Sequence, residues 1–119
     1  MLAATDTAAW DEQPTGQATF EMANLRPERT GLPFVVFISQ KAGARPDVRV
    51  KVARGPKVQA SQMGVYALRP FRFEGGMQLS SSEERQLESW ISKNLQVLVE
   101  YWDGDILYTE DALDRLVKI

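Results

Sequence analysis

The hydrophobic pattern of this 119-residue chain changes period near residue 80, and this change restricts the fold class. Before residue 80, apolar residues form short β-branched and aromatic runs or alternate with polar residues, as they do in strands. After it, they recur every three or four positions over about five or six turns, as on one face of a helix. Strands followed by a single long helix favour an α+β fold over alternating strands and helices.

Four segments carry strand patterns. Residues 34–38 are β-branched and aromatic throughout, which is typical of a central strand. Residues 47–52 alternate between valine and polar residues and predict a strand that pairs with the first in a hairpin with a long loop. Residues 18–22 predict an earlier strand. A further strand is expected within residues 65–73, bent or at an edge because Pro70 cannot donate a ladder hydrogen bond.

The helical segment has clear start and stop signals. Either Ser80 with Glu83 or Ser81 with Glu84 can form a capping box, and Gly104 suits the left-handed position that ends a helix. Thr109 is expected to cap a short last helix. The apolar stripe of the long helix consists of Leu87, Trp90, Ile91, Leu95 (with Asn94), Leu98, Tyr101 and Trp102.

These elements predict a small antiparallel sheet of three or four strands, covered on one face by the long C-terminal helix and closed at one end by the short terminal helix. We expect residues 1–16 to be a flexible N-terminal arm and residues 17–119 to form a single α+β domain. Trp10 is the one aromatic residue in this arm, and it either packs back onto the domain or anchors a partner.

The absence of cysteine and histidine excludes disulfides, thiolate and common zinc sites, and Ser-His or Cys-His catalysis. No Walker loop or dinucleotide fingerprint is present, so we expect no cofactor and no metal, and an enzyme is not favoured. No signal peptide and no stretch of about 20 apolar residues occur, which predicts a cytoplasmic protein without membrane association.

Charge is distributed unevenly along the chain. Residues 1–40 carry two bases and five acids, and residues 73–119 carry four bases and ten acids. Between them, residues 41–72, here called the basic zone, carry eight bases and one acid, Asp47. Two interpretations remain open: the basic zone is an anion-binding surface, or it is neutralised by the acidic parts of the same domain. Its eight cations are the candidate partner-binding residues: Lys41, Arg45, Arg49, Lys51, Arg54, Lys57, Arg69 and Arg72.

Three aromatic residues of or near the basic zone bear on nucleic-acid binding. Tyr66, Phe71 and Phe73 could form a platform for stacked bases beside Arg69 and Arg72. Phe71 and Phe73 share one face at strand spacing, however, and this favours a place in the core. The calculated isoelectric point near 5.2 also disfavours non-specific binding to DNA.

The order of elements over residues 33–103 resembles a family of small bacterial proteins of unknown function that are linked to toxin–antitoxin-type gene pairs. That family has an aliphatic strand, then a His/Pro-rich hairpin, and later a long helix that contains tryptophan. The corresponding segments here are the strand at residues 34–38, the segment at residues 44–50 and the helix from Trp90 to Trp102. The family's hairpin histidines are absent, and Arg45, Asp47 and Arg49 occupy this stretch. The resemblance therefore implies the fold rather than any chemistry.

The leading hypothesis is a non-enzymatic interaction module that binds an acidic partner, either protein or nucleic acid, through a basic surface of sheet and hairpin. A homodimer is also expected from the open sheet edge and the opposed charge zones. The alternative is an enzyme that acts on a nucleotide or RNA with arginine, lysine and carboxylate side chains.

Overall fold

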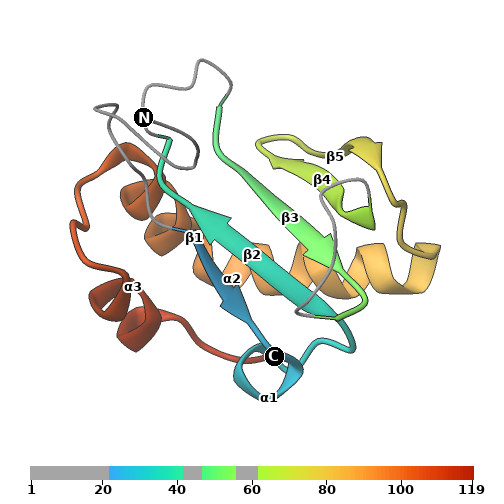
Figure 1. Cartoon of the computed structure of the whole chain (residues 1–119), viewed down its shortest axis with the longest axis horizontal. Helices are drawn as coiled ribbons and strands as arrows, with labels where there is room; N and C mark the ends of the chain where they lie inside the picture. Colours follow the sequence, from blue (N-terminus) through green and yellow to red (C-terminus); the bar gives the residue numbers. More distant parts are fainter. Residues whose placement is uncertain (1–21, 42–46, 56–61) are drawn as a thin grey trace, which may run out of the picture.

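The structure describes residues 22–41, 47–55 and 62–119. Five of its strands form an antiparallel sheet, in which they lie side by side in chain order from β1 to β5. This computed structural model confirms the α+β class, with more strands than the three or four predicted (Figure 1). The elements are β1 (Met22–Leu25), α1 (Pro27–Thr30), β2 (Val35–Ser39), β3 (Arg49–Ala53), β4 (Gly64–Leu68), β5 (Phe71–Gly76), α2 (Ser81–Asp103) and α3 (Thr109–Arg115).

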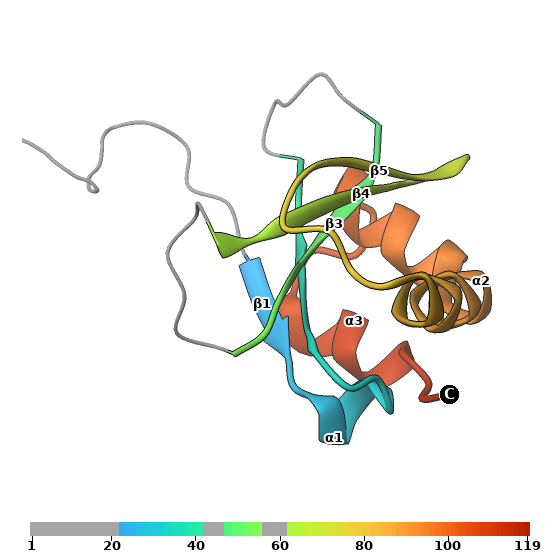
Figure 2. The ribbon, with the colours of Figure 1, turned by 90° about the vertical axis from the view of Figure 1, so that its right-hand side faces the viewer.

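The two faces of the sheet differ because side chains alternate along each strand. On the inner face, Val36 lies opposite Val52, and Val50 lies opposite Tyr66; all four side chains are buried. Helices α2 and α3 lie on the same side of the sheet (Figure 2). The outer face carries the row Phe37, Lys51 and Val65, which are register neighbours across β2, β3 and β4.

Residues 65–73, where one strand was expected, bent or at an edge, hold most of β4 and the first part of β5, with Pro70 in the turn between them. The expected strand is present as β4, and only the placement of Pro70 inside a strand was wrong, because the proline lies in the turn. The hairpin brings Tyr66 against Phe71 and Phe73, with ring centroids 5.4 and 5.3 Å apart. These aromatic pairs contribute side-chain contacts between β4 and β5.

A close backbone approach joins the open ends of β4 and β5. Gly64 lies opposite Gly76. A Cβ atom on Gly64 would lie 1.9 Å from the carbonyl oxygen of Met77, and a Cβ atom on Gly76 would lie 2.1 Å from that of Met63. Gly76 also has a φ of 81°, in the left-handed region. The chain can therefore follow this path only with glycine at both positions.

Helix α2 begins and ends at the predicted signals. Of the two expected capping boxes, the one between Ser80 and Glu83 forms, with the Ser80 side chain accepting from the Glu83 amide and the Glu83 side chain accepting from the Ser80 amide. Gly104, with φ 88°, ends the helix in the left-handed conformation. Local signals in the sequence thus determine both ends of the longest element.

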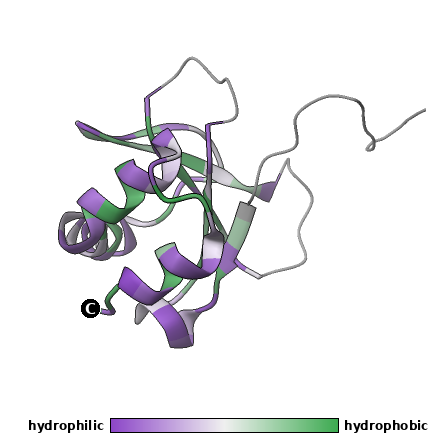
Figure 3. Cartoon of the chain, turned by 90° about the vertical axis from the view of Figure 1, so that its left-hand side faces the viewer, coloured by the Kyte–Doolittle hydropathy of each residue, from purple (hydrophilic) through white to green (hydrophobic). Residues whose placement is uncertain are grey.

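The apolar stripe of α2 packs on the sheet as predicted. Leu95 is only partly buried, whereas Val97, which was not assigned to the stripe, is buried. Hydrophobic and hydrophilic residues alternate along the ribbons of the helices, as expected for helices with one buried face (Figure 3). The buried residues of α2 are Leu87, Trp90, Ile91, Asn94, Val97, Leu98, Tyr101 and Trp102.

Asn94 is a buried polar residue that ties the C-terminal segment to α2. Its amide nitrogen donates to the carbonyl oxygens of Trp90 at 2.9 Å and of Val117 at 3.0 Å, and its Oδ1 accepts from the Val117 amide at 2.8 Å. Beyond it, the Ile119 amide donates to the Thr30 carbonyl at 3.0 Å. The segment after α3 is thereby fixed to both α2 and α1.

Some predictions need correction or lie beyond the described residues. Thr109 does not cap α3; Tyr108 holds the N-cap position without a side-chain bond, and the Thr109 hydroxyl lies 2.7 Å from the Tyr101 hydroxyl. The first strand runs from Met22 to Leu25, and most of the predicted strand at residues 18–22 lies outside the described part. The predicted arm at residues 1–16, with Trp10, lies outside it entirely.

Candidate functional site

The six described cations of the basic zone lie on different elements of the sheet and its connections. Arg49 and Lys51 lie on β3, Arg72 on β5 and Arg69 in the turn before it. Lys41 and Arg54 follow the ends of β2 and β3. The remaining two candidates, Arg45 and Lys57, lie outside the described residues.

Five of the six described cations form ion pairs. Four of them pair with acidic side chains from residues 73–119, and Arg69 pairs with Asp47 inside the basic zone. The pairs are Lys41 with Asp103 at 3.9 Å, Arg49 with Glu74 at 2.6 Å, Arg54 with Glu83 at 2.5 Å, Arg69 with Asp47 at 2.7 Å and Arg72 with Glu74 at 2.9 Å. Neutralisation inside the domain, the second interpretation of the charge pattern, therefore accounts for most of the basic zone.

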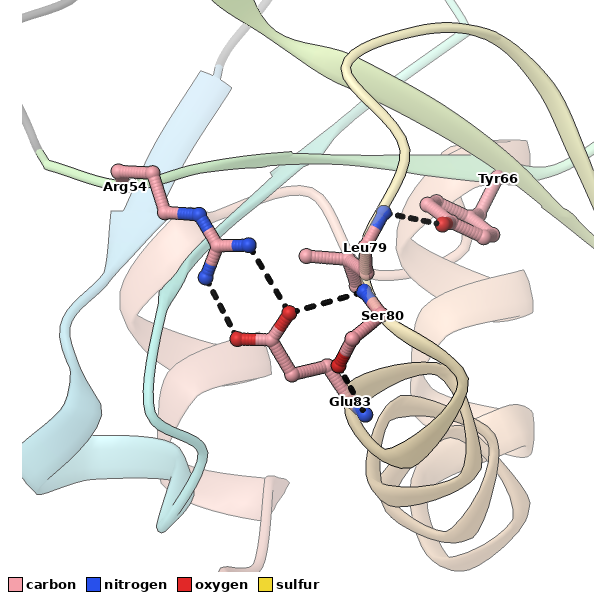
Figure 4. Close-up of polar contacts among 5 residues, drawn as sticks. All are labelled: Arg54, Tyr66, Leu79, Ser80 and Glu83. Carbon is pink, nitrogen blue, oxygen red and sulfur yellow. Dashed lines mark hydrogen bonds and ion pairs between the residues drawn. The ribbon is translucent and has the colours of Figure 1, made fainter.

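Arg54 has a structural role at the start of α2 (Figure 4). Its guanidinium donates to both carboxylate oxygens of Glu83, at 2.5 and 2.9 Å, while Glu83 also accepts from the Ser80 amide at 3.0 Å. The hydrogen bonds from Arg54, followed by that from Ser80, lower the pKa of Glu83 to about 2. This contact connects the end of β3 to the first turn of α2.

Tyr66 makes a second connection to the same turn. Its hydroxyl accepts from the Leu79 amide at 3.0 Å and donates to Glu84 at 2.7 Å (Figure 4 shows the bond to Leu79). Burial, followed by the hydrogen bond to Glu84, raises the pKa of Tyr66 to about 12. Tyr66 is buried, and Phe71 and Phe73 pack partly buried against the core, so these aromatics do not form an exposed stacking platform.

The outer face of the sheet holds the part of the basic zone best suited to a partner. Arg49 and Arg72 share one carboxylate, Glu74, so one of the two guanidinium charges is not neutralised. Together with Val65 and Phe73 they line a shallow hollow of about 450 Å³. Lys51 lies opposite Val65 in the register and forms no ion pair with any described residue. We call Arg49, Lys51, Arg72 and Glu74 the outer-face cluster.

Acid is expected to weaken the fold through the contact between Arg54 and Glu83. The folded-state pKa of Glu83 lies near 2, below the ordinary 4.5, so protonation favours the unfolded chain. The contribution is present above about pH 4.5 and is lost as the pH falls towards 2. Arg54→Met should lower the free energy of unfolding at pH 7 by about 1 kcal/mol and reduce its fall in acid.

Urea unfolding followed by circular dichroism at several pH values measures this effect. Arg85→Met is the matched control, because Arg85 is an exposed cation of α2 without an ion pair to any described residue. Equal acid sensitivity of the Arg54→Met variant and the wild type would contradict the assignment.

A second group of cations was missed by the sequence analysis. Arg26, Arg29 and Lys118 line a pocket of about 720 Å³ between α1 and α3. Two of these residues lie in the acidic first third of the chain and one in the acidic last third, so charge counts by segment hide them. No local pattern signals this group, because it depends on the contact between the two ends of the described chain.

Two findings concern metal ligands and membrane-spanning helices in the described part of the chain. Within it, no three His, Cys, Asp or Glu side chains gather into a metal site. None of the helices in the described part is both long enough and apolar enough to cross a bilayer.

In comparisons with known proteins, no family model, no curated protein and no solved structure matches the chain.

Proposed function

We propose that this protein is a non-enzymatic interaction module that binds an acidic protein segment on the outer face of its sheet. The observation that carries the proposal is the outer-face cluster, where Arg49 and Arg72 share a single carboxylate, Glu74, and Lys51 has no ion pair with a described residue. The Arg72 side chain is 60% exposed, so a carboxylate from a partner can reach it. The neighbouring hollow beside Val65 and Phe73 offers room for an extended segment.

The arrangement favours a protein over a nucleic acid. Binding along a phosphate backbone needs several cations that are free to neutralise phosphates. Among the described cations of the basic zone, Lys51 alone has no ion pair. A protein segment with one or two carboxylates matches the small excess of charge better.

The proposal is tested by the fluorescence anisotropy of a labelled deca-glutamate peptide at low ionic strength. We expect wild-type protein to bind it and the double variant Lys51→Glu/Arg72→Gln to bind at least about tenfold more weakly. Thermal stability should change little, because Glu74 keeps Arg49 as a partner. The control Arg85→Glu/Lys93→Gln makes the same change in net charge on α2 and should leave peptide binding unaltered.

Three other outcomes of these binding and sedimentation experiments would contradict the proposal. Equal loss in both double variants would mean that only net charge matters. Preference for a single-stranded oligonucleotide over the peptide would favour nucleic acid, and a dimer in sedimentation that dissociates at high salt would make a second copy of this chain the acidic partner. The resemblance to the family linked to toxin–antitoxin-type gene pairs stays a prediction, as does the alternative of an enzyme acting on a nucleotide or RNA.

A further inference from the structure

The pocket between α1 and α3 has the size and the walls of a ligand site. Its volume of about 720 Å³ lies within the roughly 300–1,000 Å³ typical of small-molecule sites. One wall is formed by α1 and the residue before it, which contribute Arg26, Glu28 and Arg29. The other wall is formed by α3 and the segment after it, which contribute Leu113, Leu116 and Lys118.

The charge of this pocket is not neutralised within the described structure. Arg26, Arg29 and Lys118 form no ion pair with any described residue, whereas five of the six described cations of the basic zone do. Glu28 is the one carboxylate among the lining residues, so the lining carries three positive charges and one negative charge. Cations that converge on a concave surface without partners attract a multiply charged anion.

The walls are held in place before any ligand binds. The Ile119 amide donates to the Thr30 carbonyl at 3.0 Å, which fixes the residue next to Lys118 against α1. On the other side, the bonds between Asn94 and Val117 fix the residue before Lys118 to α2. A site whose walls are already ordered loses less conformational entropy on binding.

The pocket also offers apolar surface. Leu113 and Leu116 are partly buried against the hydrophobic core and contribute their remaining surface to the lining. Such surface favours a ligand with an apolar group attached to its charged head, because burial of that group adds to the affinity.

We propose that the pocket between α1 and α3 binds a small phosphate monoester with an apolar substituent. The two guanidinium groups of Arg26 and Arg29 match the oxygen geometry of a phosphate, and Lys118 adds a third positive charge from the opposite wall. Leu113 and Leu116 contact the substituent. This site is separate from the outer-face cluster, so neither proposal depends on the other.

An NMR titration of the full chain with phenyl phosphate, inorganic phosphate and benzoate tests the proposal. Phenyl phosphate should shift the amide signals of residues 26, 28–31 and 113–118 in a saturable manner. It should bind more tightly than inorganic phosphate, which lacks the apolar group, and more tightly than benzoate, which carries a single charge. The double variant Arg26→Gln/Arg29→Gln should bind it at least about tenfold more weakly.

The matched control is Arg85→Gln/Lys93→Gln, which removes two exposed cations of α2 that have no ion pair with a described residue. Its affinity for phenyl phosphate should equal that of the wild type. Equal weakening in both double variants, shifts spread over the whole surface, or equal affinities for phenyl phosphate and benzoate would overturn the proposal. Binding of deca-glutamate by the outer-face cluster should be unchanged in Arg26→Gln/Arg29→Gln.

Discussion

Trp90→Ala is expected to lower the free energy of unfolding by about 3–5 kcal/mol. Trp90 is a fully buried residue of α2, with 0% of its surface exposed, so truncation leaves a large cavity in the core. A loss of this size is a large part of the roughly 5–15 kcal/mol that stabilises a typical small domain. Trp102, 5% exposed near the other end of the stripe, should behave similarly.

The variant Trp90→Phe distinguishes the effect of the ring's volume on stability from the effect of its polar nitrogen. The indole Nε1 of Trp90 is buried and has no hydrogen-bond partner among the described residues, so its desolvation is not compensated. Phenylalanine keeps most of the apolar volume and removes that atom, and we expect a loss of less than about 2 kcal/mol. Urea unfolding followed by far-ultraviolet circular dichroism measures both variants. A loss below about 1 kcal/mol for Trp90→Ala would show that α2 is not packed on the sheet as described.

Gly64→Ala should strongly destabilise the sheet, with a loss of about 3 kcal/mol or more. The added methyl group would lie 1.9 Å from the carbonyl oxygen of Met77, and a backbone atom cannot move away as a flexible side chain can. The hairpin of β4 and β5 would have to separate at its open end. Gly55→Ala is the control, because a Cβ atom there meets nothing within 4 Å.

The midpoint of urea unfolding compares the two glycine variants under the same conditions. Gly55→Ala should match or slightly exceed the wild type, because alanine restricts the unfolded chain more than glycine does. A Gly64→Ala variant as stable as Gly55→Ala would contradict the close approach of β4 and β5. If Gly64→Ala is obtained only as aggregate while Gly55→Ala is soluble, the same ranking holds.

The elements that could be predicted from the sequence are those with local signals. The capping box at Ser80 and the left-handed Gly104 delimit α2, and the valines of β3 alternate over the whole strand. The β4–β5 hairpin could not be recognised because its turn contains Pro70, which is equally consistent with a bend inside one strand. The pairing of β4 with β5 in the sheet distinguishes the hairpin from a single bent strand.

The candidate sites were harder to predict because they depend on distant partners. Arg54 and Glu83 are 29 residues apart in the chain, and their pairing follows from the way β3 meets the start of α2. The sequence showed an excess of cations between residues 41 and 72 but not which of them lie beside carboxylates. Arg26, Arg29 and Lys118 were overlooked for the same reason, since they meet only through the contact of α1 with the segment after α3.

The order of the strands also has a consequence for how the chain folds. Each strand pairs with its neighbour in sequence, so the sheet can grow one hairpin at a time without waiting for a later segment. The long-range step is the docking of α2, whose last turn meets the end of β2 where the Lys41 amide donates to the Trp102 carbonyl at 3.0 Å. The rate of folding should therefore respond most strongly to changes that alter this docking, while each hairpin forms from contacts close in sequence.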